Sequence, residues 1–209
     1  MSRPDRALPS RLVLATGNAG KLREMRAILA PWGVDVRPQS EFTPAAAEET
    51  GLSFVENAIL KARFAAEASG LPAIADDSGL EVDALHGAPG IYSARYAGPG
   101  ADDAANNARL LADLEAVPDC ARTARYRCAM VFLRWPLDPS PIVRQARWEG
   151  RIARVPRGTG GFGYDPLFLV GDGERMAAEF DPAHKNEVSH RGQALRALVA
   201  ALTEPGGGT

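Results

Sequence analysis

Apolar residues recur with two different spacings along this chain of 209 residues. Segments that are apolar throughout, or at every second position, predict β-strands, whereas apolar residues three or four positions apart predict helices. The predicted strands are residues 11–15, 34–37, 71–75, 80–85, 123–133, 142–148 and 167–170. The predicted helices are residues 21–30, the segment from Ser53 to Gly70, residues 102–115, and a last helix that Ser189 caps. Because 123–133 and 142–148 are expected to pair antiparallel, the pattern indicates an α/β fold with a mixed sheet.

The predicted strand Leu71–Ala75 is followed by two adjacent carboxylates, Asp76 and Asp77, and then by Ser78 and Gly79. Aspartate is a poor strand residue, so the strand is expected to stop there. Two buried like charges are costly unless a counter-charge lies nearby, and a divalent cation such as Mg²⁺ supplies one. An Asp-rich turn with Gly79 at positive φ explains the same residues without a ligand. This stretch by itself leaves both interpretations open.

Two glycine-containing segments have the composition of ligand-binding loops. Thr16–Lys21 lies between a predicted strand and a predicted helix, where backbone N–H groups and the helix dipole favour an anion. Lys21 opposes that dipole, which a bound phosphate would explain. Gly158–Pro166 lets a ligand approach the backbone closely, and Phe162 and Tyr164 offer flat faces for a base. A plain strand-to-helix turn and a flexible hairpin tip are the alternatives that involve no ligand.

Lysine is rare in this chain, and its positions coincide with the candidate segments. Of 24 basic residues, only Lys21, Lys61 and Lys185 are lysine. A compact ammonium suits phosphate or carbonyl oxygens, with chance as the alternative for so few residues. His190 and Arg191 stand in the first turn of the last predicted helix, against the dipole preference, and also indicate an anionic or electron-rich ligand. For Lys61, whose helix face carries polar residues, a solvated position is the favoured interpretation.

Composition and charge exclude several classes of protein. Hydrophobic residues at 45% and charged residues at 24% are typical of a soluble globular protein. A formal net charge of −2 and the lack of a basic stripe argue against nucleic-acid binding. No apolar run is long enough to span a bilayer, so we expect no membrane partner and a cytoplasmic protein. We expect a flexible leader over residues 1–10, one two-lobed domain over 11–203 and a disordered tail over 204–209.

These segments together contain the parts of a nucleoside triphosphate site with magnesium. Metal-assisted attack of water on phosphorus needs a base, a metal and positive groups, and no Ser–His or Cys–His signature indicates a covalent mechanism. The chain closely resembles the inosine triphosphate pyrophosphatase family, the dITP/XTP pyrophosphatases, from about Leu12 to Leu202. The matching motifs, in order, are Thr16–Lys21, Glu48–Gly51, Glu56–Lys61, Ala75–Gly79, Gly87–Arg95, Gly158–Asp165 and Ser189–Gly192.

The resemblance implies hydrolysis of non-canonical purine nucleoside triphosphates (ITP, dITP, XTP) to the monophosphate and pyrophosphate, with Mg²⁺ as cofactor. It implies that Asp77 is the general base and a metal ligand, with Glu48 as a second metal ligand and Asp76 in support. The phosphates would be bound by Thr16, Gly17, Asn18, Ala19, Gly20 and Lys21. Ser78 would also bind substrate, and base and sugar would contact Phe162, Gly163, Tyr164 and Asp165, with Phe162 stacking. The edge of the base would be recognised by Lys185, His190 and Arg191.

The chemistry of the purine edge agrees with these implied roles. Hypoxanthine and xanthine carry a carbonyl at C6, so donors from Lys185 or Arg191 pair with it and oppose the amino group of adenine. The resemblance also implies an elongated mixed sheet with flanking helices, two lobes around a central nucleotide cleft, and a homodimer. The alternatives are a pyrophosphatase for other modified nucleotides and a nucleotide-binding sensor without catalysis.

Overall fold

The computed structural model describes residues 8–171 and 173–203. Residues 1–7 of the predicted leader and the whole predicted tail, residues 204–209, lie outside the described residues. The chain divides into two compact units. The first unit comprises the chain up to Asp77, Ala129–Gln145 and the chain from Arg191 onward, and the second comprises Ser78–Cys128 and Ala146–His190. Neither unit is a continuous piece of the chain.

The described strands form a mixed β-sheet, as the sequence predicted. They are β1 (Arg11–Leu14), β2 (Asp35–Pro38), β3 (Ala73–Val82), β4 (Thr123–Leu133), β5 (Ile142–Ile152), β6 (Phe168–Val170) and β7 (Arg175–Met176). Their order in the sheet is β2-β1-β3-β4-β5-β6-β7. β1 pairs in parallel with β2 and β3, whereas β6 pairs antiparallel with β5 and β7.

All of the predicted helices are present, and local signals set their ends. The described helices are α1 (Ala19–Leu29), α2 (Phe54–Ser69), α3 (Asp103–Asp113), α4 (Pro182–Val188) and α5 (His190–Thr203). The side chains of Asn18, Ser53 and Asp102 accept hydrogen bonds at the N-termini of α1, α2 and α3. Gly70 ends α2 at a φ of 67°. α4 was not predicted from the sequence, although Asp181 caps it and Pro182 stands at its start. Within the described part of the chain, no helix combines the length and the apolar character needed to cross a membrane.

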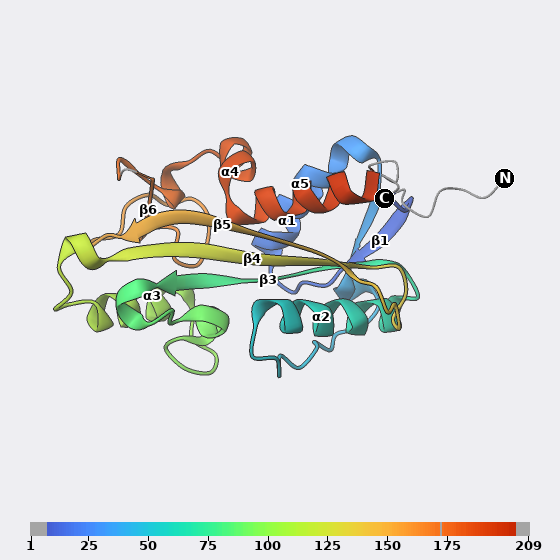
Figure 1. The fold of residues 1–209 in the computed structure, drawn as a ribbon, viewed down its shortest axis with the longest axis horizontal. Helices are drawn as coiled ribbons and strands as arrows, with labels where there is room; N and C mark the ends of the chain where they lie inside the picture. The colour runs from blue at the N-terminus through green and yellow to red at the C-terminus, as the bar shows by residue number, and fades with distance from the viewer. Residues whose placement is uncertain (1–7, 172, 204–209) are drawn as a thin grey trace, which may run out of the picture. The chain divides into compact units, whose positions relative to one another are not determined.

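Small side chains build the core of the first unit. Ala58, Ala62, Ala65 and Ala66 of α2 are buried against alanine and valine residues of β1, β3 and β4. Alanine lets the helix lie close to the sheet, which removes apolar surface of both from water. In this unit α2 lies on one face of the sheet, and α1 and α5 lie on the other (Figure 1).

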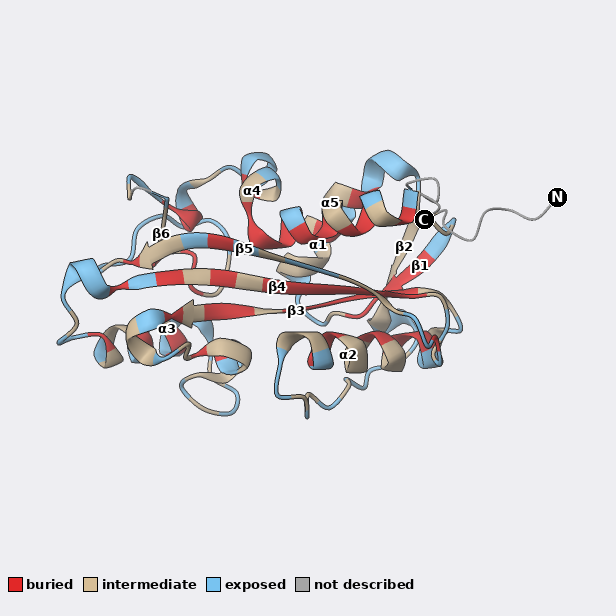
Figure 2. Cartoon of the chain, viewed as in Figure 1, coloured by how far each residue is buried: buried red, intermediate tan, exposed pale blue. Residues whose placement is uncertain are grey.

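Aromatic and branched side chains build the core of the second unit. They include Leu110 and Leu114 of α3, Tyr126 of β4, Trp148 of β5 and Phe168 of β6. β4 is buried along most of its length (Figure 2). Its early alternation places Arg125 and Arg127 on the opposite face from Tyr126, as predicted.

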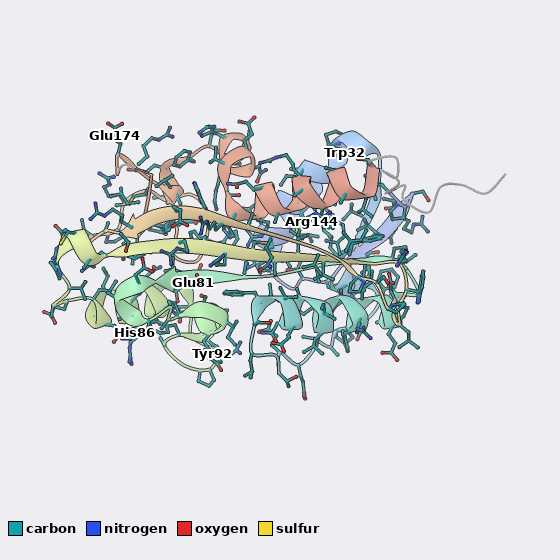
Figure 3. The ribbon with its side chains drawn as sticks, in the orientation of Figure 1. Trp32, Glu81, His86, Tyr92, Arg144 and Glu174 are labelled. Carbon is teal, nitrogen blue, oxygen red and sulfur yellow. The ribbon has the colours of Figure 1, made fainter. Side chains whose placement is uncertain are left out.

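Those two arginines form a ladder of ion pairs across the strands of the second unit. Arg127 Nε lies 2.9 Å from Glu81 Oε2 of β3, a residue labelled in Figure 3. Arg125 contacts Asp83 at 2.8 Å and Glu149 of β5 at 3.1 Å. Such partly exposed pairs contribute little to stability individually, but the ladder keeps this face of the sheet polar.

The strand boundary that matters most for the site was predicted wrongly, and it concerns the carboxylate stretch. The strand beginning at Ala73 does not stop at Asp76 but continues through Gly79 to Val82 as β3. The expectation rested on the low strand propensity of aspartate, which tertiary contacts overrule here. The basic residues that surround the two aspartates, described below, make their burial in a strand possible. The Asp-rich turn with Gly79 at positive φ, the alternative that involves no ligand, is therefore not present.

The turn between β4 and β5 depends on one buried carboxylate, which gives a prediction about stability. Asp138 accepts hydrogen bonds from Nε, Nη2 and the backbone N of Arg134, and from the backbone N of Ser140. The side-chain hydrogen bonds from Arg134 lower the pKa of Asp138 to about 2. We expect Asp138→Asn to lower the free energy of unfolding by about 1–3 kcal/mol at pH 7, because an amide loses the charge-assisted bonds.

Denaturant unfolding at several pH values measures this contribution. Because the folded-state pKa lies below the ordinary value of 3.8, the contribution is fully present above that value and is lost as the pH falls through about 2. The difference in stability between wild type and variant should therefore shrink over that range. A difference that stays constant down to pH 2 would contradict the assignment.

Candidate active site

Asp76 is the centre of a buried ion-pair cluster in the first unit. Its Oδ2 lies 2.9 Å from Lys21 Nζ of α1 and 3.3 Å from Arg191 Nε of α5. Arg191 also donates a hydrogen bond through Nη1 to Glu24 of α1. Burial alone would raise the pKa of Asp76, but the charges of Lys21, Arg191 and Lys61 hold it well below its usual range. Asp76 is therefore ionised at neutral pH and connects α1 and α5 to β3.

This cluster changes the interpretation of the cations at the helix starts. Lys21 and Arg191 do stand in the first turns of α1 and α5. Each contacts the carboxylate of Asp76, so a group of the protein itself offsets their unfavourable position against the dipole. The inference that such cations require an anionic ligand therefore loses its basis.

Asp77 is held on one side by a lysine of α2. Its Oδ1 accepts a hydrogen bond of 2.6 Å from Lys61 Nζ, which also lies 3.2 Å from Glu49 Oε1. Asp77 Oδ2 is buried and has no hydrogen-bond partner among the described residues. Burial, which outweighs the opposing effect of Lys61, raises the pKa of Asp77. Burial acts in the other direction on Lys61, but the carboxylates of Asp76 and Asp77 outweigh it and raise the pKa of that lysine.

The expectation that Lys61 of α2 is solvated was wrong, and Asn57 on the same polar face is buried as well. Asn57 is 0% exposed and accepts a hydrogen bond from Gly51 N through its Oδ1. Lys61 is largely buried between the two carboxylates it contacts. A Cβ at Gly51 would lie 2.6 Å from Glu56 Cβ, so only glycine permits this close approach to α2. The approach brings Glu49 to Lys61, a contact that sequence periodicity does not reveal.

The residues around Asp77 fit a magnesium ion by their chemistry. Mg²⁺ is held in proteins by one or two carboxylates together with substrate phosphates, so a large protein cluster is not needed. Within residues 8–171 and 173–203, no group of three or more His, Cys, Asp or Glu side chains forms a metal cluster. The buried Oδ2 of Asp77 is a hard oxygen donor of the required kind. Glu48 is exposed and stays a prediction as the second ligand.

The loop Thr16–Lys21 uses part of its own hydrogen-bonding capacity. Asn18 Oδ1 accepts from the backbone N–H groups of Gly20 and Lys21 at 2.8 and 3.0 Å. The N–H of Asn18 donates to Thr16 Oγ1. Two of the N–H groups expected to bind phosphate thus cap α1 instead. Phosphate binding by Thr16, Gly17, Asn18, Ala19, Gly20 and Lys21 stays a prediction.

A second buried carboxylate, Asp165, organises the candidate base-binding residues of the second unit. Its Oδ2 accepts hydrogen bonds from Lys185 Nζ at 2.5 Å and from Phe162 N at 2.9 Å. Lys185 Nζ lies 4.9 Å from the centre of the Phe162 ring, within range of a cation–π interaction. The structure therefore brings Lys185 to Phe162 and Asp165, two residues of the glycine-containing segment Gly158–Pro166.

Two residues of α3 hold the glycine-rich loop in place. Gly163 N donates to Asp103 Oδ2 at 2.6 Å, and Asn107 Nδ2 donates to Gly163 O at 2.9 Å. Neither contact was predicted from the sequence. The prediction for Tyr164 was wrong as far as its ring is concerned, because the ring lies in the hydrophobic core and its hydroxyl donates to Ser93 O. Its flat face is therefore not available to a base.

The roles of the three residues expected to recognise the base edge stay predictions, and each of the three has its own contacts in the structure. Lys185 and His190 belong to the second unit, where His190 is buried and its ring stacks on that of Tyr126. Arg191 belongs to the first unit, where it contacts Asp76 and Glu24. Ser78 is partly buried on β3, and its substrate contact stays a prediction.

The fold and these two clusters define a class: an α/β protein with a mixed sheet whose buried carboxylates are held by lysine and arginine. Residues 12–201 match the model of the Ham1 family. The chain belongs to this family, which confirms the relationship expected from its motifs.

Similar proteins cover almost the whole chain. A protein of Thioalkalivibrio sulfidiphilus named dITP/XTP pyrophosphatase is 62% identical over 192 residues, which are 92% of this chain and 98% of that protein. A protein of Escherichia coli O157:H7 with the same name is 56% identical, with the same two coverages of 92% and 98%. The structure of a HAM1 protein from Coxiella burnetii superposes with a TM-score of 0.85 at 50% identity, covering 93% of this chain and 99% of that chain. The dITP/XTP pyrophosphatase of Mycobacterium abscessus gives a TM-score of 0.72 at 44% identity, covering 90% and 97%.

Proposed function

We propose that this protein hydrolyses non-canonical purine nucleoside triphosphates, such as ITP, dITP and XTP, to the monophosphate and pyrophosphate. The names and high identity of its relatives support this function. The observation that carries the proposal is Asp77, a buried carboxylate with one oxygen on Lys61 and the other without a hydrogen-bond partner in the described chain. A buried base with a raised pKa is suited to take a proton from water.

In the first unit, Asp77 accepts the proton of the attacking water as the water oxygen bonds to phosphorus and the α–β anhydride bond breaks. Lys61 holds Oδ1 and so fixes the direction of Oδ2. Lys21, held by Asp76, presents an ammonium to phosphate oxygens. A magnesium ion bound by Asp77 and Glu48 would polarise the phosphate and offset its charge. The presence of Glu48, Asp76 and Asp77 argues against a sensor without catalysis, since a protein that only binds has no use for a water-activating carboxylate.

In the second unit, Lys185 donates to the C6 carbonyl of the base, and Phe162 supplies an apolar surface for its ring. Asp165 orients the ammonium by accepting one of its hydrogen bonds. An amino group at C6, as in adenine, would face another donor and be disfavoured. The recognition of the base thus depends on a lysine whose direction is set by a buried carboxylate.

The resemblance also supports three finer proposals: dependence on Mg²⁺, a homodimer and a cytoplasmic location. Chelation with EDTA should abolish turnover, and added Mg²⁺ should restore it. Light scattering should report a mass of twice the 22.2 kDa of one chain. A monomer mass would contradict the proposed dimer without affecting the proposed reaction.

The release of pyrophosphate by purified protein tests the proposed function. With Mg²⁺ present, we expect turnover of inosine and xanthosine triphosphates to exceed that of adenosine and guanosine triphosphates by about 100-fold in kcat/KM. Equal turnover of all four would contradict the base preference. If the protein hydrolysed only other modified nucleotides, it would be a pyrophosphatase for those nucleotides. Tight nucleotide binding without release of pyrophosphate would favour a sensor without catalysis.

A further inference from the structure

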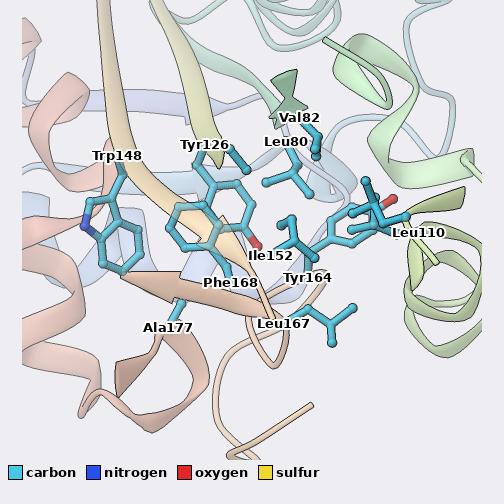
Figure 4. Packing of buried hydrophobic residues seen from close by; sticks show 12 residues of the cluster. Leu80, Val82, Leu110, Tyr126, Trp148, Ile152, Tyr164, Leu167, Phe168 and Ala177 are labelled. Atoms are coloured by element: carbon cyan, nitrogen blue, oxygen red, sulfur yellow. The ribbon is translucent and has the colours of Figure 1, made fainter. Parts of the chain in front are cut away.

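Tyr126 of β4 connects two of the candidate base-binding residues in the second unit. Its side chain is 7% exposed and packs in the hydrophobic cluster beside Trp148 and Phe168 (Figure 4). The centre of its ring lies 4.6 Å from that of Phe168 and 6.5 Å from that of Trp148. These contacts leave the ring little freedom to move, so the groups that it touches are held against a rigid support.

The hydroxyl of Tyr126 reaches the carboxylate that holds Lys185. It donates to Asp165 Oδ1 at 3.2 Å, while Lys185 Nζ and Phe162 N donate to Oδ2. Both oxygens of the buried carboxylate are thus bonded, which fixes its rotation. Because Lys185 takes its direction from Oδ2, Tyr126 acts on the ammonium through Asp165.

The face of the same ring supports His190. The two ring centres are 4.7 Å apart, and the ring planes differ by 7°. One side chain therefore contacts Asp165 through its hydroxyl and His190 through its face. A phenylalanine would fill the apolar space equally well, and a buried hydroxyl is costly without a partner. The hydroxyl is therefore explained by Asp165 and not by the packing of the core.

We propose that Tyr126 is a positioning residue that sets base selectivity by aligning Lys185 through Asp165 and by supporting the ring of His190. This inference rests on the proposed function and adds to it a residue that need not touch the substrate. Because the alignment exists before substrate binds, its loss should weaken binding of the base more than it slows the chemical step.

Tyr126→Phe separates the hydroxyl from the ring, and Tyr96→Phe is its matched control. Tyr96 also donates its hydroxyl to a carboxylate, Asp113 Oδ2, at 2.6 Å in the same unit. We expect Tyr126→Phe to raise the KM for inosine triphosphate about five-fold, with kcat unchanged within about two-fold. The preference for inosine over adenosine triphosphate should fall by about the same factor, because the misaligned lysine discriminates less. Tyr96→Phe should leave both quantities unchanged.

Tyr126→Leu removes the ring face as well and should reduce the preference about 50-fold, which exceeds the effect of the phenylalanine variant. Thermal unfolding of all variants separates this loss from misfolding, since Tyr126→Phe keeps the packed ring. A folded Tyr126→Phe protein with wild-type KM and preference would overturn the inference.

Calorimetric binding of inosine monophosphate gives a readout that does not depend on turnover. We expect Tyr126→Phe to weaken this affinity about five-fold, and Tyr96→Phe to leave it unchanged. A wild-type protein that binds the monophosphate but releases no pyrophosphate would overturn the proposed reaction, while the weaker binding of Tyr126→Phe would still support the inference. Equal affinity of wild type and Tyr126→Phe would overturn the inference and leave the proposed reaction standing.

Discussion

Asp77→Asn should lower kcat for pyrophosphate release by about 10³-fold or more and leave the fold intact. The amide has the shape of the carboxylate, but it cannot take a proton from water and is a poor ligand for Mg²⁺. Its oxygen can still accept the hydrogen bond from Lys61 that Asp77 Oδ1 accepts at 2.6 Å. Since burial raises the pKa of Asp77 and so opposes its charge, we expect the free energy of unfolding to change by less than about 1 kcal/mol.

Asp138→Asn is the reciprocal control for this experiment. Asp138 is also a buried carboxylate bound to a basic side chain, Arg134, but it closes the turn between β4 and β5. The two substitutions should therefore affect different properties: Asp77→Asn should lose activity and keep its stability, and Asp138→Asn should lose stability and keep its activity. Steady-state kinetics and denaturant unfolding of both variants measure this. Substantial turnover by folded Asp77→Asn protein would remove Asp77 as the base.

Lys185→Ala should reduce the preference for inosine over adenosine triphosphate by about 100-fold. The ammonium lies 2.5 Å from Asp165 Oδ2 and 4.9 Å from the centre of the Phe162 ring, so its donors are directed by the protein. Without it, the C6 carbonyl of hypoxanthine has no hydrogen-bond donor, and the C6 amino group of adenine no longer faces an opposing donor. Competition assays with both nucleotides give the ratio of kcat/KM directly.

The alanine variant also leaves the buried Asp165 without its cation, which should lower the free energy of unfolding by about 3 kcal/mol. Lys185→Gln separates the two effects, because its amide can still donate to Asp165. We expect both variants to lose the base preference and only the alanine variant to lose much stability. A glutamine variant with wild-type preference would show that the positive charge of Lys185 is not needed to recognise the base.

Local signals were sufficient for most of the fold. The alternating segment Thr123–Leu133 became β4 with the predicted bounds, because strand periodicity is a property of neighbouring residues. Ser53 and Gly70 mark the ends of α2 for the same reason, since a capping side chain and a left-handed glycine act within one turn. β3 was an exception, because the charges that permit its two aspartates come from α1, α2 and α5.

The candidate site was predicted in its residue types but not in its contacts. The sequence singled out Asp76, Asp77, Lys21, Lys185 and Arg191 by unusual placement and by resemblance. It did not reveal that Lys21 and Arg191 both bind Asp76, nor that Tyr164 turns its ring into the core. No sequence signal indicated the role proposed for Tyr126, because an aromatic residue at an inward-facing strand position is usually an ordinary residue of the hydrophobic core.

By itself, the sequence determined the family, the mixed α/β class and the ends of most elements, since each depends on local pattern or on motifs read in order. Only the tertiary structure decided which charges meet. Asp76 and Arg191 are 115 positions apart in the chain, and Tyr126 and Asp165 are 39 apart. Electrostatic and hydrogen-bonding partners are set by distance in space, which local periodicity does not encode, so the pairing of this site could be read only from the folded chain.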